Sequence, residues 1–300
     1  MFQMMIVAVV ISFNPNIDLL EKEYLSVIPQ VEHIIYVDNC SQNREEVRAW
    51  AEKKGRALFV GLNDNEGIGF AQNVGIRMAL ENGASHLIIF DQDTVVSDDF
   101  VQCLIQAESS ALKTGVNVGL TGPIYRSYDN YQYPVWSIEK EKLVKIPQED
   151  IGDYRQVTHI IASGSLIRKD VFEKAGLMRE DWFLGYIDFE FCFRAAQYGF
   201  KTIVTQNACM HHQMGDHQVV IFGRKIGLYS PFRRYFDCRN TILIQKEDIF
   251  PKVFRRYYLR LIVGKVIVSL VFGPSRLKQI RFCVKGFYDG MRGKTGKFDG

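Results

Sequence analysis

Short apolar runs alternate with amphipathic segments along the first part of the chain. Residues 71–80, for example, have the spacing of a helix. Continuous apolar runs that are rich in β-branched residues and end in polar residues are typical of strands buried on both faces. Residues 5–11 and 33–37 fit this description, and the apolar runs 57–60 and 86–90 are two further predicted strands. The alternation predicts an α/β fold with a mostly parallel sheet flanked by crossover helices.

The middle and the end of the chain have different patterns. Residues 121–154 mix aromatic and charged residues without a clear period, which predicts loops and short strands. Residues 259–272 are apolar apart from two cations and a serine. As a helix they would extend about 21 Å, short of the ~30 Å hydrocarbon core of a bilayer. We therefore expect one main domain followed by a helical C-terminal extension that does not span a membrane.

Composition and charge indicate a globular protein with a basic end. The 300 residues are 47% hydrophobic and 24% charged, which is enough to bury a sizeable core. The net charge is +3, yet residues 251–300 hold twelve Lys or Arg against two Asp. The six cysteines are scattered without a C-x-x-C pair, which favours a reducing, cytosolic setting. No Lys or Arg precedes the first apolar run, which favours a buried strand over a secretion signal.

Carboxylates follow two of the predicted strands. Asp91 and Asp93 come directly after residues 86–90, and the period of two in an extended chain puts both on one side. Paired carboxylates suit a hard divalent cation that is bridged to phosphate oxygens. Asp38 ends the second strand, and a carboxylate there is a strong acceptor for the N3–H of a uracil or thymine ring. Helix capping is the alternative for each of these acids.

Residues 65–75 are rich in glycine and lead into a predicted helix. They lack the third glycine spacing of a dinucleotide fingerprint, which disfavours an NAD site. Glycine here allows the helix to approach a ligand closely. Asn73 could hydrogen-bond to that ligand or to the protein itself.

Residues 182–194 embed acidic side chains among aromatic ones. Aromatic faces stack on the apolar faces of sugar rings, and a carboxylate that they shield can have a raised pKa suited to a general base. Asp188 is the candidate for that role. The alternative is an amphipathic helix in which Glu190 pairs with Arg194 at i, i+4, and both interpretations can hold together.

His211 and His212 offer imidazoles far along the chain from the acidic pair. Histidine can complete a Mg²⁺ or Mn²⁺ site together with a carboxylate and diphosphate oxygens. A position on the surface without a ligand is the alternative for such a pair.

Taken in order, these elements resemble family 2 glycosyltransferases of the GT-A fold, and within them the rhamnosyltransferase-like branch. The resemblance covers residues 6–240, which implies a main domain, residues 1–240, and a helical extension, residues 241–300. Its motifs are specific as a set although each is short. They are Val10-Ile11-Ser12-Phe13-Asn14-Pro15, Val37-Asp38-Asn39, Asn65-x-Gly67, Asn73-x-Gly75, Asp91-Gln92-Asp93, Ala162-Ser163-Gly164, residues 183–194, His212-x-Met214-Gly215 and Arg239-Asn240.

The resemblance implies a role for each matching residue. Asp188 matches the catalytic base, and Ile187 stands where an acidic residue often precedes it, which weakens a scheme with two carboxylates. Asp93 and His212 would hold a Mg²⁺ or Mn²⁺ ion, and the spacing to Gly215 favours His212 over His211. The nucleotide sugar would contact Ser12, Asn14, Asp38, Asn39, Asn65, Gly67, Asn73, Asp91, Gln92 and Asp93. The acceptor would contact Ser163, Gly164, Trp182, Glu190 and Arg194.

The resemblance also implies a reaction, the inverting and metal-dependent transfer of one sugar to a saccharide or lipid-linked saccharide in bacterial surface polysaccharide biosynthesis. The first candidate is L-rhamnose from dTDP-L-rhamnose, because the motifs are most similar to that branch. A UDP-hexose donor is one alternative, and a non-catalytic carbohydrate-binding protein of the same fold is another. A glycoside hydrolase would also use two carboxylates, but it would not need strand-end acids suited to a nucleobase and a diphosphate.

The basic extension requires a separate explanation. A basic segment with aromatic side chains, such as residues 255–285, can lie on an anionic leaflet. The protein would then be cytoplasmic and peripheral on the inner face of the cell membrane. A helical hairpin packed on the main domain, or a contact between copies in a homo-oligomer, is the alternative. No nucleic-acid-binding module accompanies the charge, so no nucleic acid partner is expected.

Overall fold

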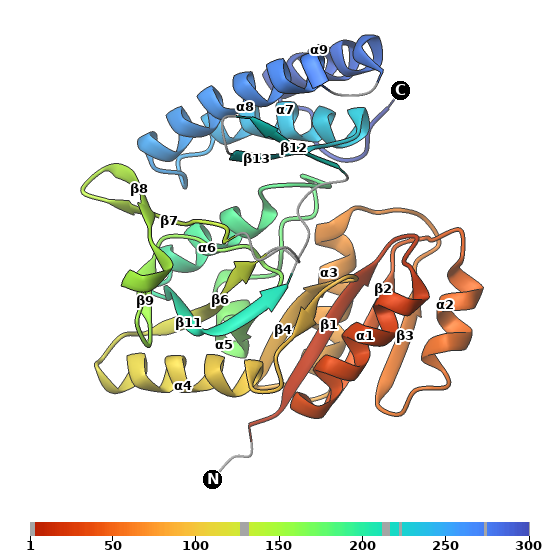
Figure 1. Ribbon diagram of the computed structural model, residues 1–300, viewed down its shortest axis with the longest axis vertical. Coiled ribbons are helices and arrows are strands. Elements are labelled where there is room, and N and C mark those ends of the chain that lie inside the picture. The colour runs from red at the N-terminus through yellow and green to blue at the C-terminus, as the bar shows by residue number, and fades with distance from the viewer. Residues whose placement is uncertain (1–3, 127–131, 212–216, 222–223, 273–274, 300) are drawn as a thin grey trace.

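The protein is built around one curled, mixed sheet (Figure 1). A computed structural model describes residues 4–126, 132–211, 217–221, 224–272 and 275–299. The strands of this sheet are β1 Ile6–Ser12, β2 His33–Asp38, β3 Ala57–Gly61, β4 His86–Asp91, β5 Val95–Val96, β6 Val118–Arg126, β9 Arg155–Val157, β10 Ser165–Arg168 and β11 Lys201–His211. Two hairpins lie outside it, namely β7 Val135–Glu139 with β8 Lys142–Ile146 and β12 His217–Ile221 with β13 Arg224–Leu228.

The order of strands in the sheet is β3-β2-β1-β4-β10-β6-β11-β5, and β9 pairs with β11. The first four strands in this order are parallel neighbours, and β6 is parallel to β11. Between these groups, β10 runs antiparallel to both β4 and β6. The prediction of an α/β fold with a mostly parallel sheet is confirmed.

Helices cover both faces of the sheet, as the alternation of side chains along β1 requires. Val7 and Val9 point into the core shared with α3 Ile68–Glu81, α5 Lys169–Ala175 and α6 Ile187–Gln197. Ala8 and Val10 point into the core shared with α1 Ile17–Val27, α2 Arg44–Ala51 and α4 Phe100–Lys113. All four side chains are fully buried. A strand with apolar residues on both faces therefore lies in the middle layer of three.

The four strands expected from the apolar runs are present, with ends that differ from the prediction by at most one residue. Residues 121–126 differ more, because they belong to β6, a nine-residue strand inside the sheet rather than a loop or a short strand. The reason is that two glycines of β6 make room for large neighbours. A Cβ at Gly119 would lie 2.8 Å from Phe200, and one at Gly122 would lie 2.9 Å from Ile160. Such positions give no hydrophobic signal although they are buried.

Three C-terminal helices, α7 Pro231–Lys246, α8 Lys252–Phe272 and α9 Arg276–Met291, form a group at the end of the molecule opposite the N-terminus (Figure 1). α9 approaches α7 closely, because a Cβ at Gly286 would lie 2.5 Å from a backbone oxygen of α7. The predicted domain boundary at residue 240 falls inside α7, and the division stays a prediction. In the described part of the chain, no helix combines the length and the apolar character needed to cross a membrane.

Candidate active site

The carboxyl ends of β2, β1 and β4 bring three predicted site residues to one edge of the sheet. In the register of the parallel pairs, Ser12 lies opposite Asp38, and Ile11 lies opposite Asp91. Ligands of open α/β sheets bind beyond this edge. The apolar runs fold as buried strands, and each of them ends in a polar residue at this edge, of which Ser12 and Asp38 are still buried.

Asp38 is fully buried and organises the turn that follows β2. Its carboxylate accepts hydrogen bonds from the backbone N–H of Ser41 at 2.9 Å, from the Ser41 hydroxyl, and from the Ser12 hydroxyl at 3.3 Å. The Ser41 Oγ also accepts a bond from the backbone N–H of Asn14 at 2.7 Å. Charge-assisted bonds of this kind are strong, so Asp38 fixes the backbone at the edge where a nucleobase contact is predicted.

An amide pair continues this edge toward α3. The Nδ2 of Asn39 donates to Oδ1 of Asn65 at 3.1 Å, and the same Oδ1 accepts from the backbone N–H of Gly67 at 3.1 Å. Gly67 has φ of 87°, a left-handed conformation that favours glycine. A Cβ at this position would lie 2.6 Å from the backbone oxygen of Phe183. The glycine therefore brings the start of α3 against the segment that carries Asp188.

Asn73 lies inside the protein rather than on the ligand edge, since its side chain is 1% exposed. Its Nδ2 donates to the backbone oxygen of Met178 and to Oε1 of Glu180, and its Oδ1 accepts from the Met178 N–H. Of the two alternatives for Asn73, the structure shows bonding to the protein itself. A contact with the donor stays a prediction.

The segment Asp91-Gln92-Asp93 is held at both sides. The backbone N–H of Phe13 donates to Oε1 of Gln92 at 2.7 Å, and the backbone N–H of Asp91 donates to Oγ of Ser163 at 3.2 Å. Gly164, with φ of 75°, follows and donates its N–H to the backbone of β4. Ser163 and Gly164, two of the predicted acceptor residues, therefore lie beside the acidic pair.

Asp188 lies in the first turn of α6 with a partly exposed side chain. Burial, together with the nearby Asp91 carboxylate, raises the pKa of its carboxyl to about 7. The N–H of Phe189, which donates to Oδ1 at 2.9 Å, and the Arg233 guanidinium act in the opposite direction. The electrostatic interaction with Asp91 shows that the structure brings Asp188 near the acidic pair.

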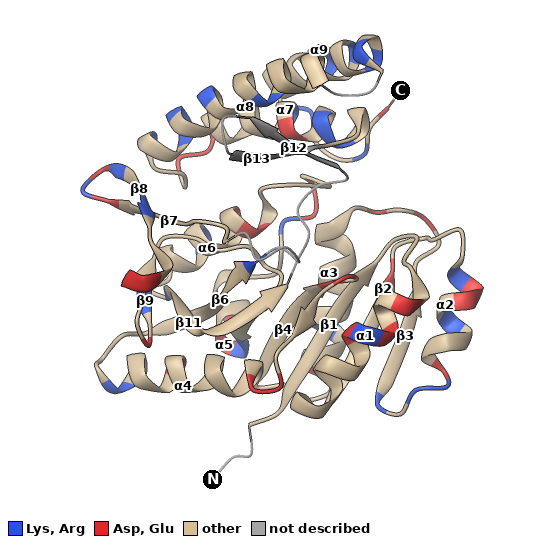
Figure 2. Ribbon diagram, viewed as in Figure 1, with Lys and Arg blue, Asp and Glu red and all other residues tan. Residues whose placement is uncertain are grey.

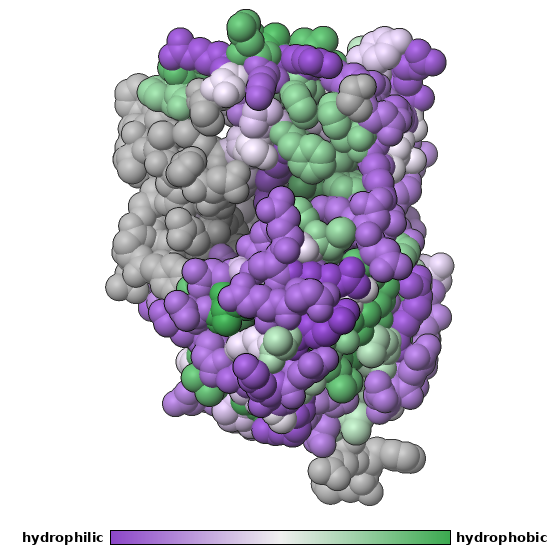
Figure 3. Space-filling view, turned by 90° about the vertical axis from the view of Figure 1, so that its right-hand side faces the viewer, coloured by the Kyte–Doolittle hydropathy of each residue, from purple (hydrophilic) through white to green (hydrophobic). Residues whose placement is uncertain are grey.

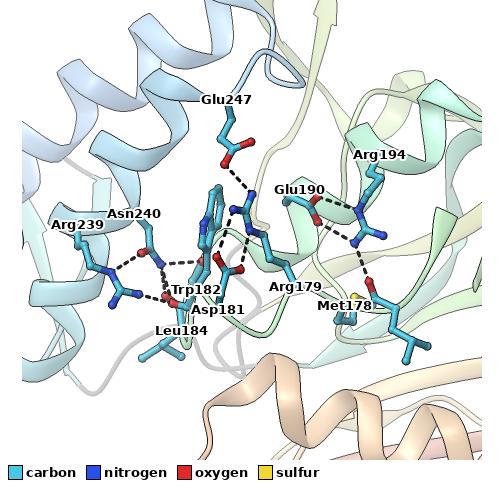
Figure 4. A network of polar contacts seen from close by, with 12 residues as sticks. Met178, Arg179, Asp181, Trp182, Leu184, Glu190, Arg194, Arg239, Asn240 and Glu247 are labelled. Atoms are coloured by element: carbon cyan, nitrogen blue, oxygen red, sulfur yellow. Dashed lines mark hydrogen bonds and ion pairs between the residues drawn. The ribbon is translucent and has the colours of Figure 1, made fainter. Parts of the chain in front are cut away.

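The other predicted residues of this segment make internal contacts (Figure 4). Trp182 has no exposed side-chain surface and stacks on Phe250 with ring centroids 5.9 Å apart. Glu190 is 4% exposed and accepts two hydrogen bonds from Arg194, as the i, i+4 alternative predicted. Arg194 also donates to backbone oxygens before the segment. Contact of these three side chains with the acceptor stays a prediction, because in this conformation their partners are protein groups.

Arg239 and Asn240 of α7 hold the same segment from the opposite side (Figure 4). Arg239 Nη2 donates to the backbone oxygen of Trp182 at 2.8 Å, and Asn240 Nδ2 donates to that of Leu184 at 2.8 Å. The side chains of Arg239 and Asn240 are both fully buried. The C-terminal helices therefore help to position the chain just before Asp188.

His212, the predicted metal ligand, lies outside the described residues. The residue before it is described and is half-buried at the end of β11. In the antiparallel pair of β11 and β5, His211 lies opposite Val95, two residues after Asp93. The sheet thus brings the end of β11 to the acidic pair.

Comparison with known proteins identifies the chain. Residues 7–176 match the family model described as glycosyl transferase family 2. The chain is also 31% identical to the dTDP-rhamnosyl transferase RfbF of Shigella flexneri over 299 residues, which cover 97% of each chain. The protein belongs to glycosyltransferase family 2. It is therefore a glycosyltransferase, and the resemblance predicted from its motifs is confirmed.

More distant proteins are similar to this family 2 glycosyltransferase in sequence or in fold. The low-salt glycan biosynthesis hexosyltransferase Agl10 of Haloferax volcanii is 22% identical, over 96% of this chain and 92% of that one. The structure of GalNAc-T7 with UDP, GalNAc and Mn²⁺ superimposes with a TM-score of 0.56 at 14% identity, over 91% of this chain and 58% of that chain. The structure of S. aureus TarS 1-349 with UDP-GlcNAc gives 0.54 at 12% identity, over 96% and 81%. These neighbours confirm the predicted GT-A fold.

A divalent cation fits the acidic pair of this glycosyltransferase. Among the described residues, no group of three or more His, Cys, Asp or Glu side chains is arranged to hold a metal by itself. Mg²⁺ usually needs only one or two carboxylates, because substrate phosphates and waters complete its coordination shell. Asp91 and Asp93, partly exposed at the carboxyl edge of the sheet, meet that requirement.

The sequence did not single out Glu23, although it lies close to the acidic pair. It is fully buried on α1, and neither of its carboxylate oxygens has a hydrogen-bond partner in the described structure. Burial raises its pKa well above the ordinary value, and the charges of Asp93 and Asp91 add to this effect. Burial therefore favours the protonated, neutral form of Glu23. The available signal was its spacing from Leu20 and Val27, which puts it on the apolar face of α1.

Proposed function

We propose that the protein is an inverting, metal-dependent transferase that moves L-rhamnose from dTDP-L-rhamnose to a saccharide or lipid-linked saccharide acceptor. The similarity to a dTDP-rhamnosyl transferase over nearly the whole of both chains supports the donor. The observation that carries the chemistry is the position of Asp188, whose carboxyl has a pKa of about 7 and lies within electrostatic reach of Asp91.

In this proposal the nucleotide binds along the carboxyl edge of β1, β2 and β4. Asp38 would accept the N3–H of thymine, with Ser12, Asn14, Asn39 and Asn65 shaping the surrounding turns through the hydrogen bonds described above. Gly67 would let the donor approach the start of α3 closely. Asn73 would influence the donor site from inside the protein. Support comes from the shared edge, since the register places Asp38 and Asp91 on either side of β1.

Asp93 would hold the Mg²⁺ or Mn²⁺ ion together with His212, and Asp91 and Gln92 would complete the edge toward the ribose and diphosphate. When bound, such an ion neutralises charge that develops on the leaving nucleoside diphosphate. The pairing of β11 with β5 supports this assignment, because it brings the residue before His212 opposite Val95.

Asp188 would act as the general base. As the acceptor oxygen attacks the anomeric carbon from the face opposite the diphosphate, the carboxylate takes the proton of the acceptor hydroxyl. The bond from the anomeric carbon to the diphosphate oxygen breaks with both electrons leaving on oxygen, so the configuration inverts in one displacement. A pKa of about 7 suits this role, because a base is most effective when its pKa is near the working pH.

Two groups of side chains would define the acceptor side of the site. Ser163 and Gly164 border the acidic pair and would form the floor of the acceptor side, since both are buried. Trp182, Glu190 and Arg194 would influence it through the shape of the segment that they hold, because their side chains bond to the protein.

A UDP-hexose donor is the second candidate. The name of the Haloferax relative, a hexosyltransferase, and the complex of TarS with UDP-GlcNAc support it. For either donor we propose a cytoplasmic setting in bacterial surface polysaccharide biosynthesis. The described cysteines are all free thiols, as a reducing compartment would maintain them.

A thermal-shift and turnover experiment tests the proposal. Full-length protein is mixed with Mn²⁺ or Mg²⁺ and with dTDP-rhamnose, UDP-glucose or UDP-GlcNAc in turn. A donor at 100 times its Kd stabilises the folded state by about 2.7 kcal/mol, and we expect dTDP-rhamnose to give the largest shift and to release dTDP when acceptor is added. A larger shift and turnover with a UDP-sugar would overturn the rhamnosyl assignment. No shift with any nucleotide sugar would overturn the proposed donor site.

A further inference from the structure

The outer surface of the two last helices is unusually apolar. Of the seventeen large hydrophobic side chains that are exposed in the described structure, ten lie on α8 and α9. We call this surface the outer α8–α9 face. Its apolar side chains are Leu259, Val263, Ile267, Val271 and Phe272 on α8, and Leu277, Ile280, Val284, Tyr288 and Met291 on α9.

These side chains form stripes rather than isolated contacts. On α8 they recur every four residues from Leu259 to Val271, which puts them on one side of the helix. The opposite side of α8 is also apolar, because Phe254 and Ile262 are fully buried. A surface helix of a globular protein normally has a polar outer face. The outer α8–α9 face is therefore typical of a binding surface rather than of a surface that faces water alone.

The charges on this face are all of one sign. Exposed cations accompany the apolar stripes, while the two helices contain one acid, Asp289, which is 2% exposed. Its carboxylate accepts hydrogen bonds from the Tyr235 hydroxyl at 2.7 Å and from Lys285 at 3.1 Å. Figure 2 shows the resulting excess of Lys and Arg on these helices. The exposed cations of these helices and their ends are Lys252, Arg256, Arg260, Arg276, Lys278, Arg281 and Arg292.

Apolar and charged side chains lie next to one another on this end of the molecule, as the top of Figure 3 shows. Arg260 follows Leu259 directly, and Arg281 follows Ile280. A helix that lies in a membrane interface has this composition, with apolar side chains in the headgroup and acyl boundary and Lys or Arg beside lipid phosphates. Neither helix is suited to cross the bilayer, within the described residues.

We propose that the outer α8–α9 face binds the surface of an anionic lipid bilayer. Charge complementarity selects this occupant, because phosphates of anionic lipids match a face that has cations and no exposed carboxylate. A second copy of the chain would bring cations against cations, which costs free energy unless carboxylates intervene. The inference goes beyond the proposed transfer reaction, and binding can be measured without donor or acceptor.

A vesicle flotation experiment tests the inference with the full-length protein. The protein is floated with vesicles of phosphatidylcholine alone, and with vesicles of phosphatidylcholine and phosphatidylglycerol in equal parts. We expect binding to the second kind and little to the first. Binding should weaken as salt is raised, because salt screens the attraction between exposed charges.

Variants of the face separate its two contributions. Each basic residue near an anionic surface contributes about 1 kcal/mol, or about fivefold in partition coefficient. The double variant Arg256→Gln, Arg260→Gln should therefore bind about 25-fold more weakly. Val263→Ser with Val284→Ser should weaken binding at high salt as well, since it removes apolar contact. Leu112 and Lys113 are exposed at the end of α4. The matched controls Leu112→Ser and Lys113→Gln should therefore bind vesicles like the unmodified protein.

Two results would overturn the inference. The first is that folded protein, as judged by its melting curve, binds both kinds of vesicle equally or binds neither kind. The second is a dimer in sedimentation velocity without lipid that Val263→Ser, Val284→Ser dissociates, which would make the face a contact between copies. The variant Asp188→Asn distinguishes this inference from the proposed function, because it should abolish transfer and leave vesicle binding unchanged.

Discussion

The side chain of Asn73 bonds to both backbone groups of Met178, a residue 105 positions away, with its Nδ2 donating to the carbonyl and its Oδ1 accepting from the N–H, each at 2.8 Å. This pair joins α3, which begins at the nucleotide edge, to the segment that leads into Asp188. The same segment is held from the other side by Arg239 and Asn240 of α7. The proposed base therefore depends on elements from three separate parts of the sequence.

Asn73→Ala should lower the free energy of unfolding by about 1–3 kcal/mol, because it leaves buried backbone groups of Met178 without partners. Urea titration measures this change. Asn82→Ala, at the end of the same helix, is the control, since the Asn82 side-chain amide donates to the nearby Met78 carbonyl and bridges no distant segment of the described chain. Equal destabilisation by the two variants would contradict a special role for the Asn73 bridge.

The activity should depend on the ionisation of Asp188. Because burial raises the pKa of this carboxyl to about 7, kcat/KM should rise about tenfold per pH unit below 7 and level off above it. Asp188→Asn should reduce kcat by about 10²–10⁴-fold, remove this pH dependence, and leave donor affinity nearly unchanged. Asp98→Asn, an exposed acid near the site, is the control. Parallel loss of donor affinity in Asp188→Asn would argue against a base.

Removal of divalent cations should abolish transfer, and Mn²⁺ or Mg²⁺ should restore it. Asp93→Asn should raise the cation concentration for half-maximal activity by at least about tenfold. Even residues that only hydrogen-bond to metal ligands affect metal affinity by that much. Titration of a chelator-treated enzyme measures the effect, again with Asp98→Asn for comparison. Unchanged cation dependence in Asp93→Asn would exclude this aspartate as a ligand.

His159 should make the protein less stable in acid. Burial among Phe189, Phe193 and Phe254 lowers its pKa to about 4. The unfolded chain then binds a proton below pH 6.5 that the folded chain does not, so this contribution to stability is full above pH 6.5 and is lost as pH falls toward 4. The loss reaches about 3 kcal/mol.

Urea titrations at a series of pH values compare the unmodified protein with His159→Phe, which should lack this loss. Asp188 acts in the opposite direction, because its raised pKa makes the folded state bind the extra proton between pH 4 and 7. Each variant is therefore compared with the unmodified protein rather than with the other. A stability difference between His159→Phe and the unmodified protein that does not change from pH 4 to 6.5 would contradict the buried neutral imidazole.

The sequence by itself determined the strands β1 to β4 and the polar residues at their ends. Those strands are continuous apolar runs, and the local pattern is enough for β1, β2 and β4 because both of their faces are buried, whereas β3 at the edge of the sheet is partly exposed. The parallel order then placed Asp38 and Asp91 at one edge, as predicted. The family was also readable, because its short motifs follow one another in order along the chain.

Only the tertiary structure decided what surrounds those residues. Trp182 has the chemistry of a sugar platform, but Phe250, from 68 residues later in the chain, covers it. Glu23 lies on the apolar face of α1, but only the packing of that helix brings its carboxylate close to the acidic pair. The apolar stripes of α8 and α9 could have faced inward, and it is the packing of α7 beneath them that leaves one side exposed. Burial depends on contacts between distant segments, and local patterns do not contain that information.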